Sequence, residues 1–173
     1  MTFRGIILLS SIIFGWPTSA MADPVANPLE SMVGTRSQNG VLQFGENKAQ
    51  VSSEVTCTQT ASAFVVVCHG KNGPDFSWLD TLSWNPKTRI LTKTSLGTIP
   101  GQGVAILEGE WDSEKRIWSI KGTRKDNNGT HAVIRSTRQF FEDGSQHFQY
   151  FEEQGGREVL MLEIKESPLK KSK

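Results

Sequence analysis

Three histidines are the first residues to consider for catalysis or metal binding, because imidazole titrates near neutral pH and ligates metals. They are His69, His131 and His147. No nucleophile and acid accompany any of them, so the spacing supports neither a catalytic triad nor a general base. Three dispersed histidines also do not make a transition-metal cluster. We therefore expect no enzymatic activity, no catalytic residue and no metal site.

The two cysteines, Cys57 and Cys68, lie in β-prone runs on either side of a short polar segment. A hairpin over this segment would bring them onto adjacent strands. A redox pair usually has two residues between its cysteines, and a zinc site needs more ligands than this. The sequence therefore favours a structural disulfide, which is typical of an oxidising compartment.

Aromatic side chains are the feature that points to a ligand. The candidate ligand-binding residues are Trp78, Trp84, Trp111, Trp118, Phe148, Tyr150 and Arg138. The aromatic rings could line a cavity for an apolar or aromatic guest, and Asp80, Arg124 or Arg138 could orient it. The alternative is that the rings only fill the interior, because burying such large side chains is itself stabilising.

The elements that must position these residues are β-strands. Residues 76–84, 105–111 and 160–165 alternate between apolar and polar side chains, which is the pattern of strands with one buried face. No window has sustained helical spacing. One short exception is expected near the start, where Asn27-Pro28 begins one or two helical turns that Gly34 ends.

Turn signals separate the predicted strands. Asn39-Gly40, Asn128-Gly129 and Asp143-Gly144 suit the positive-φ positions of tight hairpins. Two further segments, 84–90 and 111–117, repeat a Trp, an Asn or Asp, and an Arg-Ile pair at the same spacing. This repetition indicates two successive hairpins of a meander.

The number of such runs predicts about nine or ten strands joined by short connections. A long up-and-down sheet tends to close on itself, because closure removes its exposed edges. We therefore predict a single all-β, up-and-down antiparallel barrel with a short N-terminal helix. An open sheet and a two-sheet sandwich are the alternatives.

The N-terminal segment of the chain indicates where the protein is located. Residues 1–22 have the layout of a secretory signal peptide, with an uncleaved anchor as the alternative. Residues 23–166 form the predicted barrel domain and 167–173 a flexible basic tail. Without Arg4, the 19 basic side chains fall to 18, which equals the 18 acidic ones. A neutral mature chain offers no footprint for nucleic acid, and it contains no predicted transmembrane segment.

Several segments resemble a family of uncharacterised bacterial secreted proteins of unknown function, among them Leu107-Glu-Gly-Glu-Trp111, Gly122-Thr-Arg124, Phe141-Glu-Asp-Gly-Ser145 and Phe64-Val-Val-Val-Cys68. The resemblance implies a calycin-like or lipocalin-like barrel with an interior cavity and no catalytic residues to carry over. The leader peptide has no lipobox cysteine, which suits secretion into a bacterial periplasm. Lipocalin-type barrels often begin with Gly-x-Trp. Here Arg36 stands where that Trp would be, which weakens the likeness to lipocalins proper.

These observations lead to a ranked set of functions. The first is a secreted barrel that binds a small apolar or aromatic ligand in its interior. The second is an interaction or structural module of the cell envelope with a filled core, whose protein partner the sequence does not identify. A haem-binding barrel using His131 or His147, and an enzyme, are less favoured, and we expect no cofactor.

Overall fold

The computed structural model describes residues 27–73, 76–97, 103–126 and 129–169. The predicted signal peptide and residues 170–173 of the predicted tail lie outside these ranges. The described chain contains one 3-10 turn, η1 (Glu30–Met32), followed by ten strands. These are β1 (Gly34–Phe44), β2 (Asn47–Gln59), β3 (Val65–Asn72), β4 (Phe76–Asn85), β5 (Ile90–Gly97), β6 (Val104–Asp112), β7 (Ile117–Lys125), β8 (His131–Phe140), β9 (Gln146–Gln154) and β10 (Arg157–Pro168).

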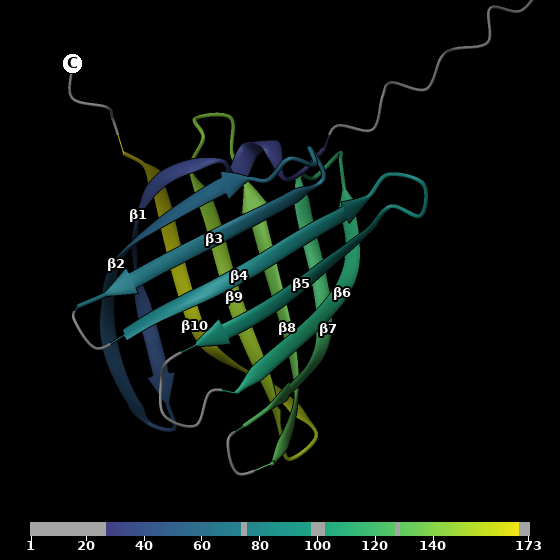
Figure 1. Ribbon diagram of the computed structural model, residues 1–173. Coiled ribbons are helices and arrows are strands. Elements are labelled where there is room, and N and C mark those ends of the chain that lie inside the picture. The colour runs from purple at the N-terminus through teal and green to yellow at the C-terminus, as the bar shows by residue number, and fades with distance from the viewer. Residues whose placement is uncertain (1–26, 74–75, 98–102, 127–128, 170–173) are drawn as a thin grey trace, which may run out of the picture.

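The ten strands form one closed antiparallel barrel (Figure 1). Each strand pairs with its neighbours in sequence, and β1 pairs with β10 to close the ring. The predicted all-β barrel of nine or ten strands is therefore confirmed. The predicted helix is only the single turn of η1, because Val33 is already extended and Gly34 pairs with Cys57 to begin β1. β10 continues to Pro168, so two residues assigned to the tail belong to the last strand.

Alternate side chains of each strand point into the barrel, as the period-two pattern predicts. In β8, Ile134, Ser136, Arg138 and Phe140 are buried, and the residues between them are more exposed. Two of these four inward positions are polar. The barrel interior is therefore not purely apolar, although the strand pattern is regular.

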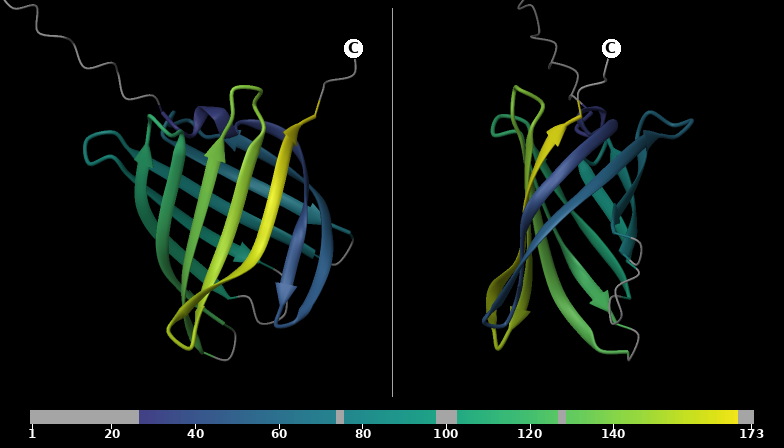
Figure 2. Two further views of the ribbon diagram at one scale, coloured as in Figure 1. Left: turned by 180° about the vertical axis from the view of Figure 1, so that it is seen from behind. Right: turned by 90° about the vertical axis from the view of Figure 1, so that its left-hand side faces the viewer.

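One end of the barrel is closed by η1, which lies across the strand ends in all the views (Figures 1 and 2). Leu29 and Met32 are buried there against the barrel core. Arg36 donates hydrogen bonds from its two terminal nitrogens to the carbonyl groups of Ser31 and Met32. Arg36 thus holds η1 in place, at the position where lipocalin-type barrels often have Trp.

The repeated Trp, Asn or Asp, and Arg-Ile segments are two hairpin turns at the η1 end. Asn85 Oδ1 accepts hydrogen bonds from two backbone N–H groups of its turn, at 3.0 and 3.3 Å, and Asp112 Oδ1 accepts one from Lys115 at 3.0 Å. Arg89 and Arg116 then adopt positive φ angles of 59° and 52°. The left-handed conformation reverses the chain, so that each following Ile begins a new strand.

The predicted Asp143-Gly144 turn is confirmed, with Gly144 at φ 80° and the Asp143 carboxylate accepting a hydrogen bond from the Ser145 N–H at 2.9 Å. The predicted Asn39-Gly40 turn is wrong, because both residues lie inside β1. A Cβ atom on Gly40 would lie 2.0 Å from the Glu163 carbonyl oxygen. Gly40 is therefore needed for the close approach of β1 to β10. Asn128 lies outside the described residues.

The predicted disulfide is present, and it joins Cys57 to Cys68. The two cysteines are direct partners in the register of β2 and β3, and both are buried. The bond therefore crosslinks two neighbouring strands from the inside of the barrel. Within the four described ranges, no helix is long and apolar enough to cross a membrane.

Candidate functional site

The four tryptophans of the described chain fall into two groups. Trp84, Trp111 and Trp118 are buried in the apolar cluster under η1. The rings of Trp111 and Trp118 each meet the Phe140 ring edge to face, with centroids 5.5 Å apart. We call these three tryptophans with Phe140, Leu29 and Met32 the plug. The rings of the plug fill space, as the packing interpretation predicts.

Trp78 is the fourth, and it lies away from η1, in the half of β4 that leads to the opposite end. It is half-buried, as are Ala132 and Tyr150, and all three pack against the edge of the core. A Cβ atom on Gly70 would lie 1.9 Å from the Trp78 ring, so the indole lies flat on the β3 backbone. β4 and β9 are five places apart in the ring of ten, so Trp78 and Tyr150 occupy opposite walls.

Other inward-facing side chains at this end are also only half-buried. Leu42, Val51 and Leu162 have the inward phase of their strands, yet water still reaches them. Inward-facing side chains near η1 are buried throughout, as Leu91 and Trp118 illustrate. The end opposite η1 is therefore the more open one, and we call it the mouth.

A charged pair lies on the inner wall of the mouth. Arg124 of β7 contacts Glu152 of β9, with Nη1 and Oε1 2.7 Å apart. The hydroxyl of Tyr150 donates a hydrogen bond to the same oxygen of Glu152 at 2.9 Å. Burial, and then the charge of Glu152, raise the pKa of Tyr150 well above its ordinary value. Tyr150 is therefore a neutral hydrogen-bond donor at physiological pH.

A second polar group lies deeper in the barrel, beside the plug, because Arg138 pairs with Trp118 and Gln146 pairs with Phe140 in the strand register. Arg138 contacts Glu166, with Nη1 and Oε1 2.6 Å apart, and also donates to Gln146 at 2.7 Å. Gln38 donates to Glu166 at 2.9 Å, across 128 residues of sequence. Arg36, Gln38, Arg138, Gln146 and Glu166 are all buried, and we call them the inner polar cluster.

A third pair, on the opposite wall, joins Lys93 Nζ to Asp80 at 2.8 Å, with Ser95 donating to the same carboxylate at 2.5 Å. The Phe148 ring lies between two cations, 5.3 Å from Lys93 Nζ and 4.9 Å from the Arg138 guanidinium carbon. Phe148 is thus part of a polar layer. The interior combines an aromatic plug, a charged middle and a half-open mouth.

The predicted ligand-binding residues therefore do not form one site. Trp84, Trp111 and Trp118 lie in the plug, Phe148 and Arg138 in the charged middle, and Trp78 and Tyr150 at the mouth.

Sequence reasoning missed the charged residues Arg36, Lys93, Glu152 and Glu166. The alternation along each strand could have identified them as inward-facing. Lys93 lies two residues after the buried Leu91, and Glu166 lies two residues after the buried Ile164.

All three histidines have the outward phase of their strands. His69 and His131 are exposed, and His147 pairs with Glu163 on the outer surface, with Nε2 and Oε1 2.8 Å apart. None can reach the interior, so the arrangement gives no support to the haem alternative through His131 or His147. No group of three or more potential metal-ligating side chains occurs in the described part of the chain.

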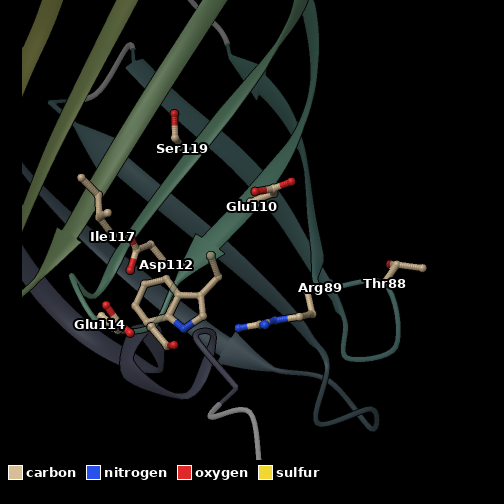
Figure 3. A pocket seen from close by; sticks show the side chains of 9 residues that line it. Thr88, Arg89, Glu110, Asp112, Glu114, Ile117 and Ser119 are labelled. Carbon is tan, nitrogen blue, oxygen red and sulfur yellow. The ribbon is translucent and has the colours of Figure 1, made fainter.

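A hollow of about 610 Å³ lies on the outside, between the β4–β5 and β6–β7 turns (Figure 3). Its lining is mainly polar and includes the charged side chains of Arg89, Glu110, Asp112 and Glu114, and Trp111 of the plug borders it. A smaller hollow of about 200 Å³ lies over β1, β2 and β10 and includes Val41 and Met161. Both hollows are lined chiefly from the outer face of the barrel, so neither is the predicted interior site.

Comparison with known proteins supports the fold alone. No protein-family model matches the chain, and no curated protein matches its sequence. The crystal structure of Rv2717c from M. tuberculosis is similar, with a TM-score of 0.61 and 11% sequence identity, covering 84% of this chain and 99% of that one. The predicted barrel thus has a solved counterpart, whereas the proposed membership of an uncharacterised secreted family, and a lipocalin classification, gain no support.

Proposed function

We propose that this protein is an exported binding protein that takes a small apolar or aromatic molecule into the mouth of its barrel and catalyses no reaction. The observation that carries the proposal is the contrast between the two ends. η1 and the plug close one end, whereas Trp78 and Tyr150 remain half-buried at the other. Half-buried aromatic rings on opposite walls supply flat apolar contacts that a guest can complete.

Polar groups that orient a guest are also present at the mouth. Arg124 is half-buried, and its Nε atom, although shielded from water, has no hydrogen-bond partner. Asp80 and Arg138, the other two orienting residues suggested by the sequence, lie deeper in the barrel, where each is ion-paired. Arg124 is therefore the one of the three that we assign to the part of a guest that lies at the mouth.

Export is part of this proposal. The Cys57–Cys68 disulfide fits an extracellular or periplasmic location, because thiols of the cytosol are kept reduced. The composition of residues 1–22 agrees with it. Cell fractionation with detection of the mature N-terminus tests this part, and retention of residues 1–22 on a cytosolic protein would contradict it.

Native mass spectrometry and tryptophan fluorescence test the binding proposal. We expect a co-purified or added aromatic guest to appear as a bound mass and to quench fluorescence in the wild type. The same guest should quench much less in Trp78→Phe, because the plug tryptophans lie at the far end. A chain that binds no member of a lipid and aromatic panel, by either measurement, would refute the proposal.

A second candidate function is an interaction module of the envelope, and an exposed patch on the outer wall favours it. Leu79, Leu96 and Val104 are neighbours in the β4–β5–β6 register. With Ile106 and Val133, they are 37 to 55% exposed, and we call these five residues the outer patch. Apolar patches on a surface often mark contacts with other proteins. Cross-linking in the native envelope tests this, since Ile106→Glu should then remove a cross-linked product.

A further inference from the structure

The side chains that point into the barrel carry an excess of positive charge. Among the described residues, the buried or half-buried charged side chains with the inward phase are Arg36, Lys93, Arg124, Arg138, Asp80, Glu152 and Glu166. Four are cations and three are carboxylates, so the interior has a formal charge of +1. Burying a net charge is costly unless an opposite charge accompanies it.

The excess lies in the inner polar cluster. Lys93, Arg124 and Arg138 each contact a carboxylate, at 2.8, 2.7 and 2.6 Å. Arg36 instead donates to the backbone carbonyl groups of Ser31 and Met32, which carry no formal charge. Glu166 attracts Arg36 from nearby, but the same carboxylate is already paired with Arg138. Two guanidinium groups therefore share one carboxylate.

Unused hydrogen-bond donors lie in the same cluster. The Nε atoms of Arg36 and Arg138 are fully buried and have no hydrogen-bond partner. Both residues are more than nine-tenths buried, with Arg36 7% and Arg138 5% exposed. An N–H donor left unpaired in the interior costs free energy, which a group that only accepts hydrogen bonds would recover. A carboxylate is such a group.

We propose that the guest is an organic monoanion, with an aromatic or apolar body and one acidic group that Arg36 and Arg138 bind. This inference rests on the proposed binding function and specifies its ligand class. The inward residues of β9 set the orientation, since they run Gln146, Phe148, Tyr150 and Glu152 from the plug toward the mouth. The acid points toward the plug, and the body lies along Phe148 and Tyr150.

A matched pair of ligands, naphthoate and naphthamide, separates charge from shape. They share an aromatic body and differ in the charge of one group. We expect naphthoate to bind at least about tenfold more tightly, because a hydrogen bond to a charged group is worth more than one to a neutral group. Equal affinities would overturn the anion inference and leave the binding proposal intact. Failure of both to bind would refute both proposals.

Variants that change the interior charge test whether Arg36 and Arg138 cause the preference for naphthoate. Arg36→Gln lowers the interior charge to zero and should remove most of the preference for naphthoate, whereas Arg36→Lys keeps the charge and should retain it. Glu166→Gln raises the charge and releases Arg138, so naphthoate should bind at least about threefold more tightly and naphthamide should be unchanged. A purely structural role predicts that Glu166→Gln weakens both ligands equally, and that result would contradict the proposal even if Arg36→Gln does not fold.

Discussion

At the η1 end of the barrel, Trp84, Trp111 and Trp118 pack with Phe140 under a turn that Arg36 holds in place. At the mouth, Trp78 of β4 and Tyr150 of β9 have side chains that remain half-buried. Both ends use large aromatic residues with the inward phase. Whether such a residue stabilises the fold or can bind a guest depends on the side chains packed against its two faces. An aromatic side chain that its neighbours already cover has no surface left for a guest.

The charged pairs of the interior follow the same division. Arg138 and Glu166, near the plug, have side chains only 7% and 2% exposed, whereas Arg124 and Glu152 at the mouth are 21% and 11% exposed. An ion pair that water reaches contributes less and is easier to rearrange than one without water. Breaking the Arg124–Glu152 pair to bind a guest should therefore cost less free energy than breaking the Arg138–Glu166 pair.

The largest contrast is expected from tryptophan truncation. Trp118→Ala should destabilise the protein by about 3–5 kcal/mol, because it leaves a cavity in the plug. Trp78→Ala should cost only about 1–2 kcal/mol, because its ring is half-buried. Urea unfolding of both variants measures the difference. Equal losses would mean that the two ends are packed alike.

Removal of one carboxylate from each ion pair is the next contrast. Glu166→Ala should cost about 3 kcal/mol or more, since it leaves Arg138 and Arg36 uncompensated in the interior. Glu152→Ala should cost less, about 1–2 kcal/mol, because water can approach Arg124. Chemical denaturation checks both values. An Arg138→Met/Glu166→Leu double variant should recover much of the loss, and a failure to recover it would contradict this account.

Tyr150 makes the mouth sensitive to high pH. Burial and Glu152 raise its pKa, so the folded protein holds the phenol proton more strongly than the unfolded chain does. This contribution to stability is complete below the ordinary tyrosine pKa of about 10 and falls as the pH rises above it. Tyr150 is the single tyrosine of the chain, so phenolate absorbance follows it directly. We expect no phenolate before unfolding, and Tyr150→Phe should remove the alkaline loss of stability. Ionisation of the native protein near pH 10 would contradict the prediction.

The smallest effect is expected at the two turns near the plug. Arg89 and Arg116 have positive φ angles, which cost a residue with a Cβ about 1 kcal/mol. Arg89→Gly and Arg116→Gly should therefore stabilise the protein by up to about 1 kcal/mol in thermal unfolding. Lys87→Gly, in the same connection but without a positive φ angle, is the matched control and should not stabilise. Destabilisation by both arginine variants would show that their side chains matter more than their backbone.

Much of the fold could be predicted from sequence because strand alternation and turn residues are local signals. The alternation of residues 76–84 and the repeated Trp84 and Trp111 turns identified strands and hairpins correctly. The turn predicted at Asn39-Gly40 was wrong, because glycine is favoured both in a tight turn and where two strands approach closely. Only the position of Glu163 in space shows that Gly40 has the second role. The Cys57–Cys68 disulfide was predictable because the two cysteines are only 11 positions apart in the sequence, in one hairpin.

The charged interior could not be predicted in the same way. Its partners are far apart in sequence, as with Gln38 and Glu166, or lie on strands whose pairing was unknown. The inward phase of Glu166 and Lys93 follows from that of their apolar neighbours, Ile164 and Leu91, but phase alone does not identify the partner of a charged side chain. Seven residues were proposed to bind the ligand, but they are divided among the plug, the charged middle and the mouth, because a Trp in a strand signals burial without indicating depth.

The contrast between a closed and an open end is tested most directly by acrylamide quenching of tryptophan fluorescence. A Trp16→Phe background leaves the four tryptophans of the described residues as the only reporters. We predict that acrylamide quenches one fraction of the emission readily, that Trp78→Phe removes this fraction, and that a bound guest protects it. Emission that is quenched uniformly, or an accessible fraction that persists in Trp78→Phe, would contradict the account.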